Sequence, residues 1–211
     1  MIQQPIRCDL ITWGEVSRLT KRVATSLRDS GFQPDVVVGI ARGGWIPARL
    51  LCDQLDLYDL VSMRIAHYQS GAHKAREAKL SAPLPIEVRD LQVLLVDDVS
   101  DTGDTLRLAL DHVRAFAPRA VKVAVLHHKE VSPVIPDYYG KKVVSWRWLV
   151  YPWAVMEDLS SFLAAMDPCP PSPERAAEKL RIDHGLDIPR TLAAEVLAHL
   201  RQRRSVQPTE S

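Results

Sequence analysis

The sequence has almost no net charge and no long apolar run, and both absences limit what it can do. Its 27 Lys and Arg residues nearly balance 26 Asp and Glu residues, so no overall basic excess favours a nucleic-acid partner, although a local basic groove stays compatible. No apolar stretch reaches the roughly 18 residues that a membrane span requires. The N-terminus, MIQQPIRCDL, lacks the apolar core of a signal peptide. We therefore expect a cytoplasmic protein without a membrane partner.

Cysteine is scarce, and the three cysteines show no CxxC spacing. Cys8, Cys52 and Cys169 therefore suit inert thiols in a reducing compartment. Hydrophobic residues make up 46% of the chain and charged residues 25%, which is ordinary for a globular protein. The 211 residues allow one sizeable domain with a core and a small appendage.

Strands and helices are expected to alternate along most of the chain. Thr12–Ser30 starts with a possible capping box and repeats apolar residues at helical spacing. The apolar runs Val36–Ile40 and Leu91–Val96 indicate buried strands. Further strands are expected at Asp59–Ala66, Val121–His127 and Val143–Val150, and further helices at Ala48–Leu55 and Gly103–Phe116. This order predicts an α/β fold, in which a parallel twisted sheet carries helices on both faces.

A proline-rich break divides the chain near its C-terminal end. Asp167–Pro173 contains four prolines in seven residues and is typical of a linker. We therefore expect a main domain over residues 1–166, a linker over 167–173 and a helical extension over 174–211. The extension contains two short helical patterns, Glu174–Leu180 and Arg190–Arg203, which suit packing on the domain or on a neighbouring subunit.

The most informative segment is Val93–Leu106, where an apolar strand ends in two carboxylates and a short loop leads into a helix. N–H groups at a helix N-terminus favour an anion, glycine allows close approach of the backbone, and threonine adds hydroxyl donors. Adjacent carboxylates would repel a phosphate unless they face ribose hydroxyls or a bridging magnesium ion. The residues of this candidate phosphate site are Asp97, Asp98, Asp101, Thr102, Gly103, Asp104 and Thr105.

This segment resembles the phosphoribosyl pyrophosphate signature of the type I phosphoribosyltransferases. The resemblance implies that Asp97 and Asp98 hold the ribose hydroxyls, directly or through Mg²⁺, and that Asp101–Thr105 hold the 5′-phosphate. It also places Asp101 near N7 of the base as a candidate general acid/base. Small hood elements are then expected near residues 1–15 and 140–165, and a homodimer or higher homo-oligomer is implied.

Two further segments are similar to functional loops of that family. Ala41, Arg42, Gly43 and Gly44 follow a strand and match the pyrophosphate loop, where the family often has a cis peptide bond that would fall at Ala41–Arg42. The polar segment His67–Pro85 is expected to be a long mobile loop. The sequence leaves open whether this loop contains a hairpin. The segment falls where the family carries its flexible catalytic loop, and Tyr68, with Lys74, Arg76 and Lys79, is the candidate there.

The later part of the chain resembles the xanthine–guanine and archaeal-type hypoxanthine–guanine branch. A lysine donor and an aromatic face suit a flat base with an exocyclic oxygen. By the resemblance Lys129 meets O6 of a 6-oxopurine, Trp148 stacks on the base, and the backbone near Leu149 reads its edge. Trp146 competes with Trp148 for the stacking role, since strand alternation would put both on one face.

The preferred purine stays open, because the relatives' acid after the Pro-Trp pair is replaced by Ala154. Hypoxanthine, guanine and xanthine therefore keep equal weight. We expect a magnesium-dependent enzyme that transfers phosphoribose from 5-phosphoribosyl 1-pyrophosphate to a purine base, as in purine salvage. One alternative is another acceptor, such as adenine or a pyrimidine. A second is a regulatory protein of the same fold that senses the donor without catalysis.

Overall fold

The structure, a computed structural model, describes residues 6–69 and 76–206. The chain divides into two compact units. Gly14–Trp146 form one, here called the sheet unit, while Met1–Trp13 and Arg147–Ser211 form the other, here called the helical unit. No helix in the described ranges is long and apolar enough to cross a membrane.

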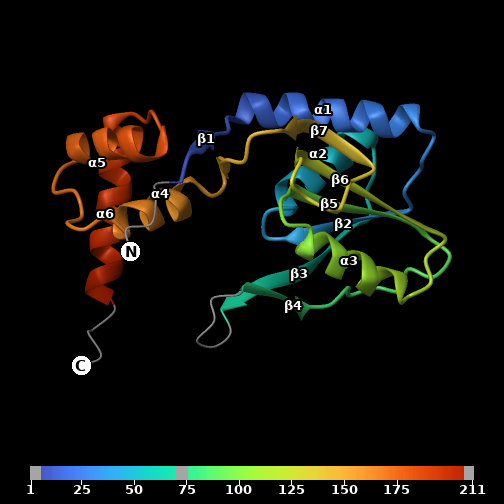
Figure 1. Cartoon of the computed structure of the whole chain (residues 1–211). Coiled ribbons are helices and arrows are strands. Elements are labelled where there is room, and N and C mark those ends of the chain that lie inside the picture. Colours follow the sequence, from blue (N-terminus) through green and yellow to red (C-terminus); the bar gives the residue numbers. More distant parts are fainter. Residues whose placement is uncertain (1–5, 70–75, 207–211) are drawn as a thin grey trace. The chain divides into compact units, whose positions relative to one another are not determined.

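The sheet unit contains six strands in the order β4-β3-β2-β5-β6-β7, flanked by helices (Figure 1). All neighbouring strands are parallel except β3 and β4, which form an antiparallel hairpin. The strands are β2 (Val36–Ala41), β3 (Leu60–Gln69), β4 (Arg76–Ala82), β5 (Gln92–Ser100), β6 (Ala120–Lys129) and β7 (Tyr138–Val143). The helices are α1 (Trp13–Asp29), α2 (Trp45–Leu55) and α3 (Asp104–Arg114).

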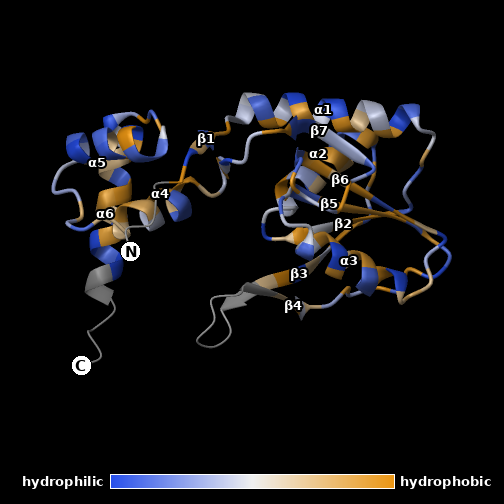
Figure 2. Cartoon of the chain, viewed as in Figure 1, coloured by the Kyte–Doolittle hydropathy of each residue, from blue (hydrophilic) through white to orange (hydrophobic). Residues whose placement is uncertain are grey.

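The alternation of side chains along β5 explains why helices lie on both faces of this sheet. Val93 and Leu95 belong to a buried cluster that includes Leu106 and Val113 of α3. Leu94 and Val96 belong to a second cluster, with residues of α1 and α2. Figure 2 shows the matching hydrophobic colour along the central strands. The predicted α/β fold, with a largely parallel sheet and helices on both faces, is confirmed.

Two local predictions were wrong, and a third was left open by the sequence. The strand expected at Val143–Val150 is replaced by β7 and by β8 (Trp148–Val150), which lie in different sheets. The hairpin that was left open within His67–Pro85 is present, formed by β3 and β4. Residues 70–75, including Lys74, lie outside the described residues. The strand expected at Leu91–Val96 continues to Ser100, because β6 pairs with it along the whole of that length.

The helical unit combines the two ends of the chain. A short strand, β1 (Cys8–Leu10), pairs in parallel with β8. Four helical segments follow: α4 (Val155–Ala164), α5 (Pro173–Lys179), a single π-turn η1 (Leu180–His184) and α6 (Arg190–Val206). Leu159 of α4, Leu180 of η1 and Val196 of α6 are all fully buried in one hydrophobic cluster. The expected boundaries at 167–173 and 174–211 lie inside this unit and stay a prediction.

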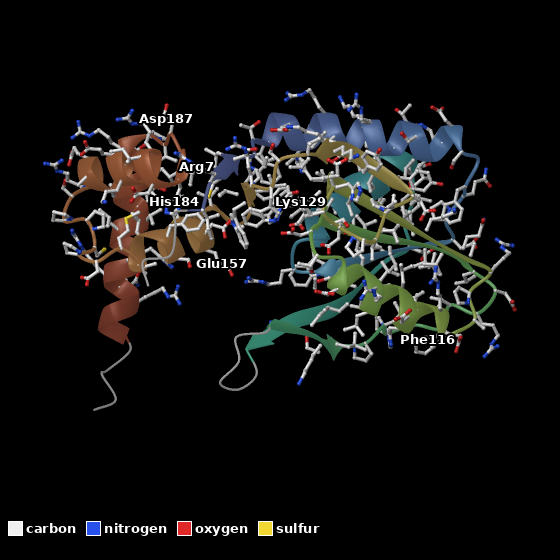
Figure 3. The ribbon with its side chains drawn as sticks, in the orientation of Figure 1. Arg7, Phe116, Lys129, Glu157, His184 and Asp187 are labelled. Carbon is white, nitrogen blue, oxygen red and sulfur yellow. The ribbon has the colours of Figure 1, made fainter. Side chains whose placement is uncertain are left out.

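Polar contacts also join the N-terminal strand to the helical segments. His184 Nδ1 lies 2.8 Å from the Ile6 carbonyl oxygen, and its ring stacks on Phe162 at 4.4 Å. Arg7 donates to the Ile182 carbonyl at 3.4 Å, and Figure 3 labels Arg7 and His184 in this unit. Residues 174–206 therefore pack within the helical unit.

Candidate functional site

The loop between β5 and α3 presents a helix N-terminus. Gly103 is the N-cap residue of α3, with φ of 82°, and no side chain caps the helix there. A positive φ favours glycine, and a Cβ at this position would lie 2.9 Å from Val134 Cγ2. Thr102 Oγ1 donates to Asp104 Oδ2 at 2.8 Å. The first turn of α3 therefore offers backbone N–H groups and hydroxyls of the kind that bind phosphate.

Two buried serines hold the start of the loop between β5 and α3 in place. Ser100 Oγ and Ser132 Oγ lie 2.7 Å apart, and they approach the Val134 carbonyl oxygen at 3.1 and 3.2 Å. Both side chains are almost fully buried, so the pair ties the end of β5 to the segment after β6. Sequence reasoning missed both serines, because nothing in their spacing signals that they meet.

The paired carboxylates lie on β5 itself. Asp97 is buried, and its Oδ1 accepts a hydrogen bond from the Asp98 backbone N–H at 3.0 Å. Burial, and secondly the neighbouring Asp98 carboxylate, raise the pKa of Asp97 well above its usual value. Partners that stabilise the ionised form, such as hydroxyl groups or a divalent cation, therefore suit this position.

The glycine loop after β2 packs directly against these carboxylates. A Cβ on Gly43 would overlap the Asp98 carboxylate, and a Cβ on Gly44 would overlap the Val96 carbonyl oxygen. Arg42 is exposed, and the Ala41–Arg42 peptide bond is cis, where the resemblance places one. The two sequence motifs thus meet at the carboxyl ends of the parallel neighbours β2 and β5.

A buried lysine completes the edge of the loop. Lys129, the last residue of β6 and labelled in Figure 3, is 2% exposed. Its Nζ lies 2.7 Å from Asp101 Oδ2 and 4.3 Å from the centre of the Trp146 ring. Trp146 Nε1 donates to Asp101 Oδ1 at 3.0 Å. The structure therefore brings together Asp101, Lys129 and Trp146.

The remaining base-site candidates, Trp148 and Leu149, belong to β8 of the helical unit. The Trp148 backbone N–H donates to the Arg7 carbonyl at 3.0 Å. Its indole nitrogen is buried without a hydrogen bond of normal geometry. Burial raises the pKa of the Asp158 carboxyl to about 6, and the nearby Trp148 side chain only partly opposes this rise. The assignment of Trp148 and Leu149 to the base stays a prediction.

Tyr68 lies on β3, where its backbone pairs with Glu77 of β4. Its side chain lies outside the described residues, as does that of Arg76. Lys79 is described and exposed. The catalytic role of Tyr68 therefore also stays a prediction.

The metal-binding capacity of the site depends on two carboxylates. Within residues 6–69 and 76–206, no group of three or more His, Cys, Asp or Glu side chains is placed to hold a metal ion. Magnesium is commonly held by one or two carboxylates together with water and substrate oxygens. Asp97 and Asp98 fit that mode, in which the substrate supplies the remaining ligands.

His127 is buried, and desolvation lowers its pKa to about 4, so it stays neutral near pH 7.

Comparisons with known proteins agree with this geometry. Residues 11–157 match the phosphoribosyl transferase domain family. The chain is 39% identical to the bifunctional protein PyrR of Ralstonia nicotianae, over 68% of this chain and 83% of that protein. It is 29% identical to a xanthine-guanine phosphoribosyltransferase of Nitratidesulfovibrio vulgaris, over 68% and 82%. The crystal structure of a purine phosphoribosyltransferase from Pyrococcus horikoshii superposes with a TM-score of 0.61 at 34% identity, covering 70% of this chain and 94% of that one.

Proposed function

The chain belongs to the phosphoribosyl transferase domain family, and we propose that it transfers phosphoribose from 5-phosphoribosyl 1-pyrophosphate to a 6-oxopurine. The observation that carries this proposal is the buried Lys129 ammonium, 2.7 Å from the Asp101 carboxylate beside the phosphate loop. Such a pair supplies one donor for an exocyclic oxygen and one acceptor for a ring N–H. A 6-oxopurine carries those two groups side by side, as O6 and N7–H.

The donor is proposed to bind along the carboxyl ends of β2 and β5. The N-terminus of α3, with Thr102–Thr105, would hold the 5′-phosphate. Asp97 and Asp98 would accept hydrogen bonds from the ribose hydroxyls, which favour the ionised form of the buried Asp97. Ala41–Gly44 would receive the pyrophosphate, since Gly43 and Gly44 leave the backbone accessible and Arg42 adds a charge-assisted donor.

The reaction forms a bond between a purine nitrogen and ribose C1 as the C1–O bond to pyrophosphate breaks. Pyrophosphate leaves with the electron pair, and the base loses one proton. Magnesium, which enters with the donor, would supply positive charge for the leaving group. Asp101 would hold the proton at N7, Lys129 would hold O6, and Tyr68 is proposed to act on the reacting atoms from β3.

The acceptor is the finer part of the proposal. Lys129 disfavours adenine, whose 6-position bears an amine donor instead of an acceptor. The roles of Trp148 in stacking on the base and of Leu149 in reading its edge stay predictions from the family resemblance. Two relatives are named for purine or xanthine-guanine substrates, while the 39% identical relative is named a bifunctional protein. The names of these relatives therefore do not decide whether hypoxanthine, guanine or xanthine is the preferred acceptor.

A turnover assay tests the proposal. Purified protein with the donor and magnesium is offered hypoxanthine, guanine, xanthine, adenine, uracil and orotate in parallel. We expect turnover of one or more 6-oxopurines, and a loss of about 100-fold or more in Asp101→Asn. Asp111→Asn, an exposed position on α3, is the matched control and should retain activity.

The competing candidate is a protein that senses the donor without catalysis. It predicts calorimetric binding of 5-phosphoribosyl 1-pyrophosphate with no turnover of any of the six bases. That result would reject the enzyme and leave the phosphate loop with a regulatory role.

A further inference from the structure

Trp146 is held by the candidate site although it is not a core residue. It lies between β7 and β8 on an irregular segment, and 44% of its surface is exposed. Within the described residues it is not part of the three hydrophobic clusters of the protein. The contacts that hold its indole are the hydrogen bond to Asp101 Oδ1 at 3.0 Å and the Lys129 ammonium, 4.3 Å from the ring centre.

These two contacts are the ones that an acceptor base would need. In the function proposed above, on which this inference rests, a flat heterocycle donates N–H to Asp101 and approaches Lys129. The Trp146 indole is a flat heterocycle whose N–H already donates to Asp101 and whose ring already lies under the Lys129 ammonium. The side chain therefore reproduces, within the chain, the recognition expected of the substrate.

Both oxygens of Asp101 are engaged in this arrangement. Lys129 takes Oδ2 at 2.7 Å and Trp146 takes Oδ1 at 3.0 Å. A base that presents N7–H to Asp101 while Lys129 reaches O6 must approach the carboxylate from the Oδ1 side, where the Trp146 indole lies. The base and the indole therefore compete for the same side of Asp101 and for the same place beside Lys129.

We propose that Trp146 is an autoinhibitory gate, which occupies the position of the acceptor base in the free protein and leaves when the purine binds. Its place on an exposed irregular segment allows this movement, since neighbouring Val144 is also 68% exposed. A ligand that binds only the open state has its apparent affinity reduced by the open fraction. The gate therefore weakens binding of the base without touching the donor.

Steady-state kinetics of Trp146→Ala test this gate. We expect KM for the purine to fall by about 3- to 10-fold, with KM for the donor unchanged and kcat not lowered. Trp146→Phe keeps an aromatic ring but cannot donate a hydrogen bond, so its KM for the purine should lie between those of the wild type and of Trp146→Ala. Tyr58→Ala is the control, because it truncates an aromatic residue that is 88% exposed and bonded to Asp56. A raised KM for the purine would overturn the gate and make Trp146 a stacking platform, and an unchanged KM would overturn it as well.

Fluorine NMR of protein labelled with 5-fluorotryptophan separates failure of the gate from failure of the proposed function. The Trp146 signal, identified by its loss in Trp146→Phe, should shift in Asp101→Asn whether or not the protein is an enzyme. Guanosine or inosine 5′-monophosphate should move the signal in the same direction. If a nucleotide binds by calorimetry and the signal stays in place, the gate is rejected and the function stands. If no base is turned over and no nucleotide binds, the function fails and the gate with it.

Discussion

The Lys129 ammonium lies 2.7 Å from the Asp101 carboxylate, across 28 residues of sequence. The lysine side chain is 3% exposed and the aspartate side chain is 29% exposed. The ammonium is therefore shielded from water, while the carboxylate stays partly accessible to it. A nearly buried ammonium requires a counter-charge, and Asp101 supplies it at the start of the loop between β5 and α3. The same geometry aligns a donor and an acceptor for one ligand.

Replacing Lys129 by Met should impair recognition of the base more than recognition of the donor. The variant keeps the apolar stem and removes the donor to O6, and it leaves Asp101 without its cation. We expect kcat/KM for hypoxanthine to fall by about 100-fold or more, since an unpaired buried partner costs several kcal/mol. Lys122→Met is the matched control, because Lys122 lies on the same strand in an exposed pair with Asp137. Equal losses in the two variants would contradict a specific role for Lys129.

Gly43→Ala should weaken donor binding, because the added methyl group would overlap the Asp98 carboxylate. Either the loop or the carboxylate must move, so we expect affinity for 5-phosphoribosyl 1-pyrophosphate to fall by about 10-fold or more by calorimetry, with a lower Tm. The double variant Gly43→Ala/Asp98→Ala removes the overlap. It should recover Tm without recovering donor affinity, and strictly additive losses of Tm would show that the two residues do not meet.

Asp97→Asn should stabilise the free protein at neutral pH. The folded-state pKa of Asp97 is raised by burial and by Asp98, so the folded protein resists ionisation that the unfolded chain accepts. Stability is therefore lost as pH rises from the usual carboxyl pKa towards the raised one. We expect the Tm of the variant to exceed that of the wild type by about 2 °C or more at pH 7.5.

The same pair of proteins gives two further readouts. The difference in Tm should shrink as pH falls through and below the usual carboxyl pKa, where the Asp97 side chain is protonated in both the folded and the unfolded state. The donor with magnesium should raise the Tm of the wild type and not of Asp97→Asn, because the asparagine cannot serve as a carboxylate ligand. A variant less stable than the wild type at pH 7.5 would contradict the account of Asp97.

Leu180→Ala should destabilise the helical unit, because Leu180 is fully buried beside residues of α4 and α6. Leucine-to-alanine changes in cores cost about 2–5 kcal/mol, which denaturant unfolding can measure. Ile182→Ala is the control on the same helical turn, with a side chain that is 55% exposed. If Leu180→Ala proved as mild as the control, residues 174–206 would be an independent appendage.

The sequence allowed the fold class and the places of the two motifs after β2 and along β5 to be predicted, because both depend on local patterns, while binding of phosphate by the loop stays a prediction. Apolar runs define β2 and β5, and the carboxylates and glycines stand at fixed distances after them. The bounds of β5 were harder to predict, since its last four residues are held by pairing with β6 rather than by apolar content. The break between β7 and β8 was missed because Val143–Val150 is rich in the β-branched and aromatic residues that favour a strand.

Contacts between distant segments account for the other differences. The Ser100–Ser132 pair and the hydrogen bond from Trp146 to Asp101 join residues 32 and 45 positions apart, and no single-sequence pattern encodes them. Helix α4 was not predicted, since its residues were considered only as part of a hood. The integration of residues 174–206 with β1 and β8 depends on tertiary packing, which a proline-rich segment obscures.

The ratio of kcat/KM for hypoxanthine to that for adenine tests the central claim most directly, because the two bases share the purine ring and differ in the 6-substituent and in the proton on the adjacent N1. Lys129 beside Asp101 predicts that hypoxanthine is used and that adenine is disfavoured by about 100-fold or more, since a mismatched polar group leaves buried partners unpaired. Equal use of the two bases, or a preference for adenine, would contradict the assignment of Lys129 to a purine oxygen.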